Sequence, residues 1–241
     1  MCGRFVSSTP PDALAAYFGA TTIAESLLEA SYNVAPTNLV PTVTDRDGDR
    51  SLDLFRWGLV PFWAKDLRIG NRMINARAET VAEKNAFRSA FRKRRCIIPA
   101  DAFYEWVRIE GDDRKQPVAI SRADGAPFAF AGLWESWRDP EAGEDAAAVR
   151  TCTIITGSPN EKVAKIHDRM PVMLPHGVWD PWLDDTNDDV AALKSLLTAA
   201  PSELITIHAV STEVNNPRAR GEGLLDPVVN PALTDADGRV A

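Results

Sequence analysis

Short strand-like segments, more numerous than helical ones, are the feature that most constrains how this chain can fold. Five of them are predicted in close succession, over residues 97–98, 102–109, 117–121, 128–136 and 151–156. No long helical segment of the kind that connects parallel strands separates them. The pattern therefore predicts an α+β fold with a mostly antiparallel, barrel-like sheet flanked by short helices.

The rest of the chain adds strands and helices of similar length. Strands are expected over 39–44, 52–59, 170–174 and 203–211, and helices over 85–94, 159–165, 177–183 and 188–199. A further helix is expected to end at Gly19, with Thr9 as its N-terminal cap. We expect one domain over residues 1–241, with a core over 2–228, an acidic surface insertion over 138–148 and an irregular tail from Asn216.

The composition is that of an ordinary globular chain, with 45% hydrophobic and 25% charged residues. No apolar run approaches the roughly 18 residues that a membrane span requires. No basic region followed by an apolar stretch marks a secretory signal at the N-terminus. These features predict a cytoplasmic protein without a membrane partner.

Charge is distributed unevenly along the chain. The formal net charge of −7 disfavours nucleic-acid binding only weakly, because acidic and basic residues are segregated. Acidic residues gather over 45–49, 141–145, 184–185 and 188–189, whereas basic residues gather over 88–95. One basic face on an acidic protein can still hold a phosphodiester backbone.

The cysteine and histidine residues predict neither a disulfide framework nor a metal site. Cys96 and Cys152 lie in apolar strand-like segments and are expected to be buried. There is no CxxC motif, and His167, His176 and His208 are not at metal-ligand spacing. We therefore expect no metal and no cofactor.

Cys2 is the most reactive candidate. A small second residue permits removal of Met1, which would leave a free amine and a thiol on one residue. Their reference pKa values are similar, about 8 for the amine and about 8.5 for the thiol. An aldehyde can form an imine with such an amine and then close to a thiazolidine with the sulfur. Alternatively, the small residue serves only to permit removal of the methionine.

Two further segments place polar side chains where chemistry is possible. In an extended backbone, Asn75 and Arg77 point to the same side. In a strand, Glu105 shares a face with Phe103 and Val107, and partial desolvation there would raise its carboxyl pKa toward the range of a general acid or base. The alternative for the first segment is a turn in which Arg77 is merely exposed. The alternative for the second is that Glu105 is solvated and acts only as a surface charge.

His167 lies between a predicted helix and a predicted strand, beside Asp168 and Arg169. A side chain at such a junction can reach a cleft, although a structural role is the alternative. A basic stripe of the predicted helix over 85–94 follows i, i+4, i+7 spacing and can contact phosphates or simply be solvated. Its members are Arg88, Arg92 and Arg95.

Two loop segments can contact unpaired bases. Trp57 and Trp63 flank a Gly- and Pro-containing stretch, and aromatic rings in loops can stack on bases. Residues 38–41, ending in Pro41, can insert as an apolar wedge between base steps. Packing of these side chains in a core is the alternative for both segments.

Taken together, five segments resemble one known family in order and spacing. Residues 1–5, 75–79, 94–100, 103–106 and 167–171 match motifs of the SRAP family (SOS response-associated peptidase), and residues 211–216 look like its C-terminal signature. The resemblance covers residues 2–228. It implies a covalent thiazolidine between Cys2 and the ring-opened aldehyde of an abasic site in single-stranded DNA, formed during the DNA damage response.

The resemblance also implies roles for individual residues. The catalytic set is Cys2, Asn75, Glu105 and His167. The DNA contacts are Arg4, Arg77, Arg88 and Arg169, with Trp63, Trp106 and Pro41 as stacking or wedge residues. The implied partner is single-stranded DNA, including junctions with duplex, bound by a monomer associated with the nucleoid. Peptidase, hydrolase and lyase-like activities are also attributed to this family.

Three other functions remain open on the sequence. Cys2 can be the nucleophile of an N-terminal-nucleophile amidase, with its own amine as base. Cys2, Glu105 and His167 can form a cysteine peptidase. A non-covalent single-stranded DNA-binding protein would keep its salt-sensitive affinity after Cys2→Ala.

Overall fold

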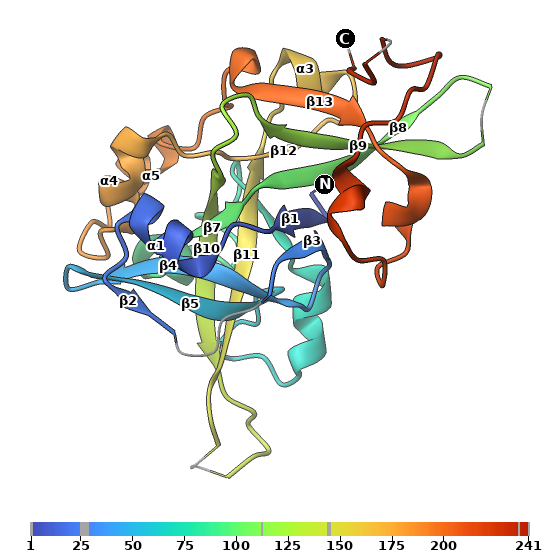
Figure 1. The fold of residues 1–241 in the computed structure, drawn as a ribbon. Helices are drawn as coiled ribbons and strands as arrows, with labels where there is room; N and C mark the ends of the chain where they lie inside the picture. Colours follow the sequence, from blue (N-terminus) through green and yellow to red (C-terminus); the bar gives the residue numbers. More distant parts are fainter. Residues whose placement is uncertain (1, 25–28, 112, 144–145, 236, 241) are drawn as a thin grey trace.

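Two β-sheets make up most of the described chain (Figure 1). The computed structural model describes residues 2–24, 29–111, 113–143, 146–235 and 237–240. The smaller sheet has the order β13-β9-β8-β1-β3, and each neighbouring pair is antiparallel. Its strands are β1 (Phe5–Ser7), β3 (Ser31–Val34), β8 (Ala102–Arg108), β9 (Lys115–Arg122) and β13 (Ile205–Ala209).

The larger sheet closes on itself. Strands β11, β10, β7, β4 and β5 pair in sequence, and β5 pairs again with β11, so these five strands form a barrel. Strands β2, β6 and β12 extend the sheet beyond the barrel. The strands are β2 (Thr22–Ile23), β4 (Leu39–Arg46), β5 (Asp49–Trp57), β6 (Asn75–Arg77), β7 (Arg95–Ala100), β10 (Phe128–Trp137), β11 (Val149–Gly157) and β12 (Met170–Pro171).

The predicted fold class is confirmed, because most strand pairs are antiparallel and the helices are short. Three pairs are parallel, namely β2 with β5, β5 with β11 and β6 with β11. The helices are α1 (Pro11–Phe18), α2 (Arg88–Lys93), α3 (Glu161–Ala164), α4 (Trp179–Leu183) and α5 (Val190–Ser195). The 3-10 turns are η1 (Leu67–Arg72), η2 (His176–Val178), η3 (Ser202–Leu204), η4 (Thr212–Asn215) and η5 (Glu222–Leu225).

The first helix corrects one prediction and confirms another. Thr9 does not cap α1, because its hydroxyl and its N–H both donate to the Asp101 carboxylate. The N-cap position is Pro10 instead. Gly19 ends the helix as predicted, with a φ of 68° in the left-handed region that favours glycine.

Several predicted elements are shorter in the structure. Helix α2 begins at Arg88 rather than at residue 85 and ends at Lys93, and β12 covers only the first two residues of the predicted strand 170–174. The predicted basic stripe is wrong at Arg95, which begins β7 and is buried. Its guanidinium donates to the backbone carbonyls of Trp182 and Asn187, so it joins two segments instead of facing solvent.

The main hydrophobic core lies between the two sheets and includes the N-terminal cysteine. Phe5 of β1 meets Trp57 of β5 edge to face, with ring centroids 5.0 Å apart. Cys2 is fully buried in the same cluster, as are Cys96 and Cys152, which confirms the predicted burial of these two strand cysteines. The N-terminal segment is therefore part of the core.

Two irregular segments were also predicted. The acidic stretch 138–148 connects β10 and β11, and its loop projects beyond the rest of the molecule (Figure 1), although residues 144–145 lie outside the described residues. The C-terminal tail contains the short turn η5 and returns to the smaller sheet, where Val210 bridges Pro227. None of the helices described is long and apolar enough to cross a membrane.

Gly132 of β10 provides a test of the packing between strands. A Cβ atom on Gly132 would lie 2.8 Å from Cys96 Sγ and 3.1 Å from the Thr153 carbonyl oxygen. Because both neighbours belong to paired strands, we expect Gly132→Ala to lower the free energy of unfolding by about 1–3 kcal/mol. Urea denaturation measures this change. Gly177→Ala is the control, since a Cβ there meets nothing within 4 Å, and equal stabilities of the two variants would contradict the packing argument.

Candidate active site at the N-terminal cysteine

Strand β1 carries Cys2 into the site. Phe5 pairs with Phe103 of β8 on one side and with Val34 of β3 on the other. The backbone N–H of Tyr104 also donates to the Arg4 carbonyl oxygen at 3.0 Å. This pairing fixes a segment that would otherwise fray at the chain end. Met1, whose removal the sequence predicts, lies outside the described residues.

Asn75 contacts the reactive residue directly. Its Nδ2 donates to the Cys2 carbonyl oxygen at 2.8 Å. Strand β6, which carries Asn75, pairs in parallel with β11 and is extended, as the predicted common side of Asn75 and Arg77 requires. The Asn75 Oδ1 is buried and has no hydrogen-bond partner among the described residues. An acceptor therefore remains available next to Cys2.

Glu105 lies within the apolar core, as the alternation of β8 predicts. It is 3% exposed, and Phe103 and Val107 on the same strand face belong to the main core. Burial raises the pKa of the Glu105 carboxyl above its ordinary value of 4.5. Burial, followed by the nearby charge of Glu105, also raises the pKa of the Cys2 thiol. Cys2 and Glu105 are thus electrostatic neighbours in a poorly solvated site.

His167 approaches the same carboxylate from the end of α3. Its backbone N–H donates to the Val163 carbonyl oxygen, and its ring lies near enough to Glu105 that protonation of the ring would lower the pKa of the Glu105 carboxyl against the effect of burial. The ring Nδ1 accepts the Arg169 N–H at 2.9 Å. Asp168 Oδ1 lies 2.9 Å from the same nitrogen, a contact that needs a protonated ring. The hydrogen bond from the Arg169 backbone N–H needs the lone pair of Nδ1. We therefore assign the neutral ring with its hydrogen on Nε2.

Two of the predicted DNA-contacting arginines are engaged within the protein. Arg169 forms a bidentate pair with Glu79, at 2.6 and 2.8 Å, and also donates to the Thr156 carbonyl. Arg4 Nη1 donates to Asn33 Oδ1 at 2.6 Å and to the Val214 carbonyl at 2.9 Å. A DNA contact by either residue stays a prediction. The sequence reasoning missed Glu79 and Asn33, although Glu79 lies in the same motif as Asn75.

The other predicted DNA contacts differ in their accessibility. Arg77 and Arg88 are exposed, and Trp63 is 51% exposed beside Phe62 at 61%. Trp106 is partly buried, and its indole N–H donates to Asn215 Oδ1 at 2.6 Å. Pro41 is buried within β4, whereas Leu39 of the predicted wedge is exposed, and both line a groove. A DNA contact by Pro41 stays a prediction.

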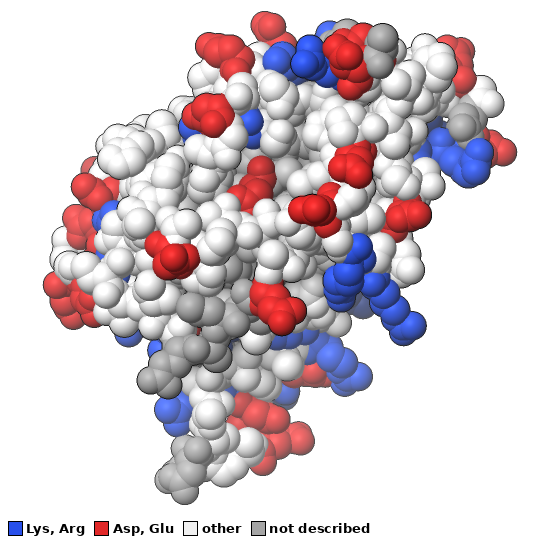
Figure 2. Space-filling view, in the orientation of Figure 1, with Lys and Arg blue, Asp and Glu red and all other residues white. Residues whose placement is uncertain are grey.

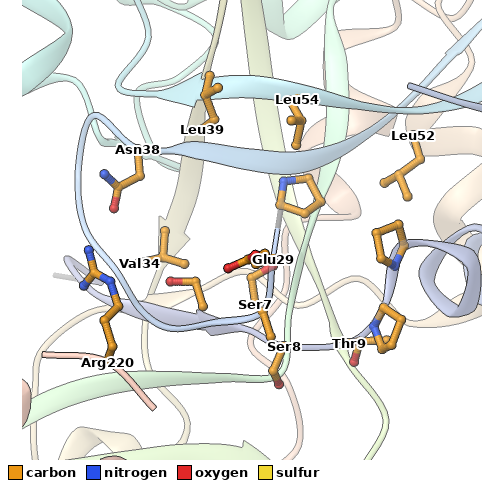
Figure 3. A pocket seen from close by; sticks show the side chains of 15 residues that line it. Ser7, Ser8, Thr9, Glu29, Val34, Asn38, Leu39, Leu52, Leu54 and Arg220 are labelled. Atoms are coloured by element: carbon orange, nitrogen blue, oxygen red, sulfur yellow. The ribbon is translucent and has the colours of Figure 1, made fainter. Parts of the chain in front are cut away.

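A groove of about 810 Å³ lies near the other end of β1 (Figure 3). Ser7 and Ser8 line it together with Leu39, Leu54 and Arg220. The described residues that line this groove do not include Cys2 or its three predicted catalytic partners. The candidate site at Cys2 therefore does not coincide with this groove.

Acidic and basic side chains both reach the surface on the face shown in Figure 2. Figure 2 shows acidic side chains scattered over one face, with Lys and Arg side chains projecting in groups from its right-hand and lower edges. No group of three His, Cys, Asp or Glu side chains among the described residues is arranged to hold a metal ion.

The fold and the candidate site define a mixed-sheet protein in which Cys2 is buried close to the buried Glu105. Residues 1–217 match the family described as SOS response associated peptidase (SRAP), and the chain belongs to this family. The resemblance inferred from the motifs is thereby confirmed.

Individual relatives agree with this assignment. The chain is 42% identical over 227 residues to the abasic site processing protein YoqW of Bacillus subtilis, covering 94% of this chain and 99% of the relative. It is 32% identical over 240 residues to the abasic site processing protein YedK of Escherichia coli, covering 95% and 100%. A crystal structure of a protein from Bacteroides thetaiotaomicron has a TM-score of 0.84 at 27% identity, covering 95% and 100%.

The raised pKa of Glu105 predicts a pH-dependent effect of Glu105→Gln on stability. The pKa of the Glu105 carboxyl is higher in the folded protein than in the unfolded chain, where it is near 4.5. The stability that Glu105 contributes is therefore fully present below the pKa of the unfolded chain and is lost as pH rises through the pKa of the folded protein. We expect the variant to have a higher melting temperature than the parent protein at pH 8 and an equal one at pH 3.

Thermal unfolding followed by circular dichroism measures this difference. The exposed Glu83, changed to Gln, is the matched control. A Glu105→Gln variant that is less stable than the parent at pH 8 would show that the ionised carboxylate is stabilised by its neighbours.

Proposed function

We propose that this protein processes abasic sites in single-stranded DNA by forming a thiazolidine cross-link through Cys2 after removal of Met1. The observation that carries the proposal is the convergence of Cys2, Asn75, Glu105 and His167 from distant parts of the chain. The relatives named above as abasic site processing proteins support DNA lesions as the substrate.

The proposed reaction joins one aldehyde to the aminothiol. The α-amine of Cys2 attacks the aldehyde carbon of the ring-opened abasic site, and loss of one water gives an imine. The sulfur then adds to the imine carbon, and the thiol proton passes to the nitrogen, which closes the five-membered ring. Because burial raises the pKa of the thiol, the sulfur enters as a thiol and the amine reacts first.

The neighbouring groups suit the proton transfers of this sequence. Glu105, with a raised carboxyl pKa, can donate a proton to the departing water and take back the proton that the nitrogen loses as the imine forms. In the closing step it can relay the thiol proton to the nitrogen. His167, as the neutral ring with a hydrogen on Nε2, can exchange protons with the sugar hydroxyls. Asn75 anchors Cys2 by its carbonyl and keeps Oδ1 available for an N–H or hydroxyl donor.

DNA binding on this proposal depends on the exposed side chains rather than on net charge. Arg77 adjoins the site on β6, and Arg88 lies at the start of α2, both exposed to solvent. Phosphate contacts by such residues supply affinity without sequence preference. Trp63 is exposed enough to stack on an unpaired base. Single-stranded DNA, alone or at a duplex junction, is the partner we propose, bound by a monomer.

The state of the Cys2 thiol bears on the cysteine peptidase interpretation. A cysteine peptidase activates its thiol by lowering the thiol pKa with an adjacent base. Here the Cys2 thiol is fully buried and its pKa is raised. These properties favour capture of an aldehyde by the amine over attack of a thiolate on a peptide.

The direct test mixes Met1-processed protein with single-stranded DNA that carries one abasic site. We expect a covalent product that survives heating in denaturant and requires Cys2. Cys2→Ala retains an N-terminal amine, so it should give no stable product unless borohydride reduces the imine. Denaturing electrophoresis, after mass spectrometry has confirmed loss of Met1, measures both results.

The remaining outcomes discriminate between the alternatives. A stable product with Cys2→Ala would exclude a thiazolidine. Absence of any product from the processed parent protein, with salt-sensitive DNA binding intact, would favour a non-covalent binding protein. Cleavage of peptides or glutamine in parallel assays would favour the amidase or peptidase.

Arg77 provides a test of the DNA contact. We expect Arg77→Ala to weaken binding to single-stranded DNA of every sequence and to reduce the slope of log affinity against log salt by about 0.7. Fluorescence anisotropy at several salt concentrations measures the slope. Arg239→Ala, in the C-terminal tail, is the control because Arg239 is also exposed. An unchanged slope for Arg77→Ala would remove this residue from the DNA interface.

A further inference from the structure

We infer that the C-terminal turn η4, together with Asn33, is a clasp that positions Cys2 and Glu105 relative to each other. The clasp is defined by Asn33, Val214, Asn215 and Asn216 and acts on Arg4 and Trp106. Its importance for cross-linking rests on the proposed function, whereas its effect on the position of Cys2 does not. None of its members is a catalytic residue, since they act through the two strands that they hold.

The first arm of the clasp reaches the segment that carries Cys2. Arg4 Nη1 donates to Asn33 Oδ1 at 2.6 Å and to the Val214 carbonyl at 2.9 Å. Asn33 is 1% exposed, and its Nδ2 donates to the Asn216 carbonyl at 3.0 Å. Both ends of the Asn33 amide are thus used, one for Arg4 and one for the turn. Because Arg4 lies two residues after Cys2, this arm holds the segment that carries the Cys2 sulfur.

The second arm reaches the strand that carries Glu105. The Trp106 indole N–H donates to Asn215 Oδ1 at 2.6 Å. Trp106 and Tyr104 lie on the face of β8 opposite to Glu105, where Val214 packs against Tyr104 in a separate small core. The turn therefore holds β8 from behind, and Glu105 projects from the other face into the main core.

The two arms meet in three consecutive residues of the turn. Val214 holds Arg4, Asn215 holds Trp106 and Asn216 holds Asn33. Arg4 lies two residues after Cys2, and Trp106 directly follows Glu105. A rigid turn with one contact to each segment restricts the relative motion of the nucleophile and the carboxyl group. Such restriction matters because a displacement of about 1 Å can slow a reaction by about a hundredfold.

Alkylation of the cysteines tests the clasp in the absence of DNA. Full-length protein is treated with iodoacetamide under native conditions, and mass spectrometry of peptides gives a rate for each cysteine. We expect Asn33→Ala and Asn215→Ala to raise the rate at Cys2 by about tenfold, the effect of one lost hydrogen bond. Cys96 and Cys152, buried in the same core, are internal controls whose rates should not change.

A matched control variant outside the clasp, and a clasp variant at an exposed position, complete the experiment. Asn230→Ala removes a side-chain hydrogen bond of the C-terminal tail, from Asn230 Nδ2 to Gln116 Oε1, that does not reach the clasp. It should leave the Cys2 rate unchanged. If buried Asn33 does not tolerate alanine, the exposed Asn215 decides the result alone. Equal acceleration at all three cysteines, or none at Cys2, would overturn the inference.

Cross-linking kinetics separate positioning from simple stabilisation. At temperatures where each variant is fully folded, we expect the clasp variants to lower the maximal cross-linking rate at saturating abasic DNA about tenfold. The DNA concentration for half-maximal rate should stay the same. A changed half-maximal concentration with an unchanged maximal rate would make the clasp a DNA-binding element. If the parent protein forms no cross-link, the proposed function is wrong. The alkylation rates, which are measured without DNA, still test the clasp.

Discussion

The pairing of β1 with β8 is the contact on which the candidate site depends. It brings the first residues of the chain beside the middle of the sequence, with Phe5 opposite Phe103. A chain end is ordinarily loosely held, because few contacts restrain it. Here β1 is enclosed between β8 and β3, and Cys2 is buried in the main core. A reactive terminus can therefore be placed with the accuracy of an internal strand.

Burial of this terminus has electrostatic consequences. The apolar surroundings raise the pKa of the Cys2 thiol and of the Glu105 carboxyl, since each charged form loses solvation. On the proposed function, a neutral thiol supplies the sulfur, and a carboxyl that holds its proton more readily than usual suits a general acid. The same low polarity that stabilises the fold thus shifts both pKa values in the direction that the proposed chemistry needs.

The arginine residues named above fall into two groups that differ in what their guanidinium groups contact. Arg4, Arg95 and Arg169 direct their guanidinium groups to carboxamide, carbonyl or carboxylate oxygens of the protein. Arg77 and Arg88 remain exposed. On the proposed function, Arg77 and Arg88 are the cations open to a phosphate backbone, while the first group joins segments distant in sequence. Counts of basic residues alone do not distinguish the two groups.

The sequence by itself determined the fold class, the family and the strand alternation that buries Glu105, because these follow from local periodicity and from short motifs. Only the tertiary structure decided which polar groups are already paired. Arg4 and Val214 are 210 residues apart, and Arg169 and Glu79 are 90 apart. The burial of Arg95 likewise depends on α4 and its following loop. Such contacts depend on how strands and turns pack together, and no local pattern encodes that arrangement.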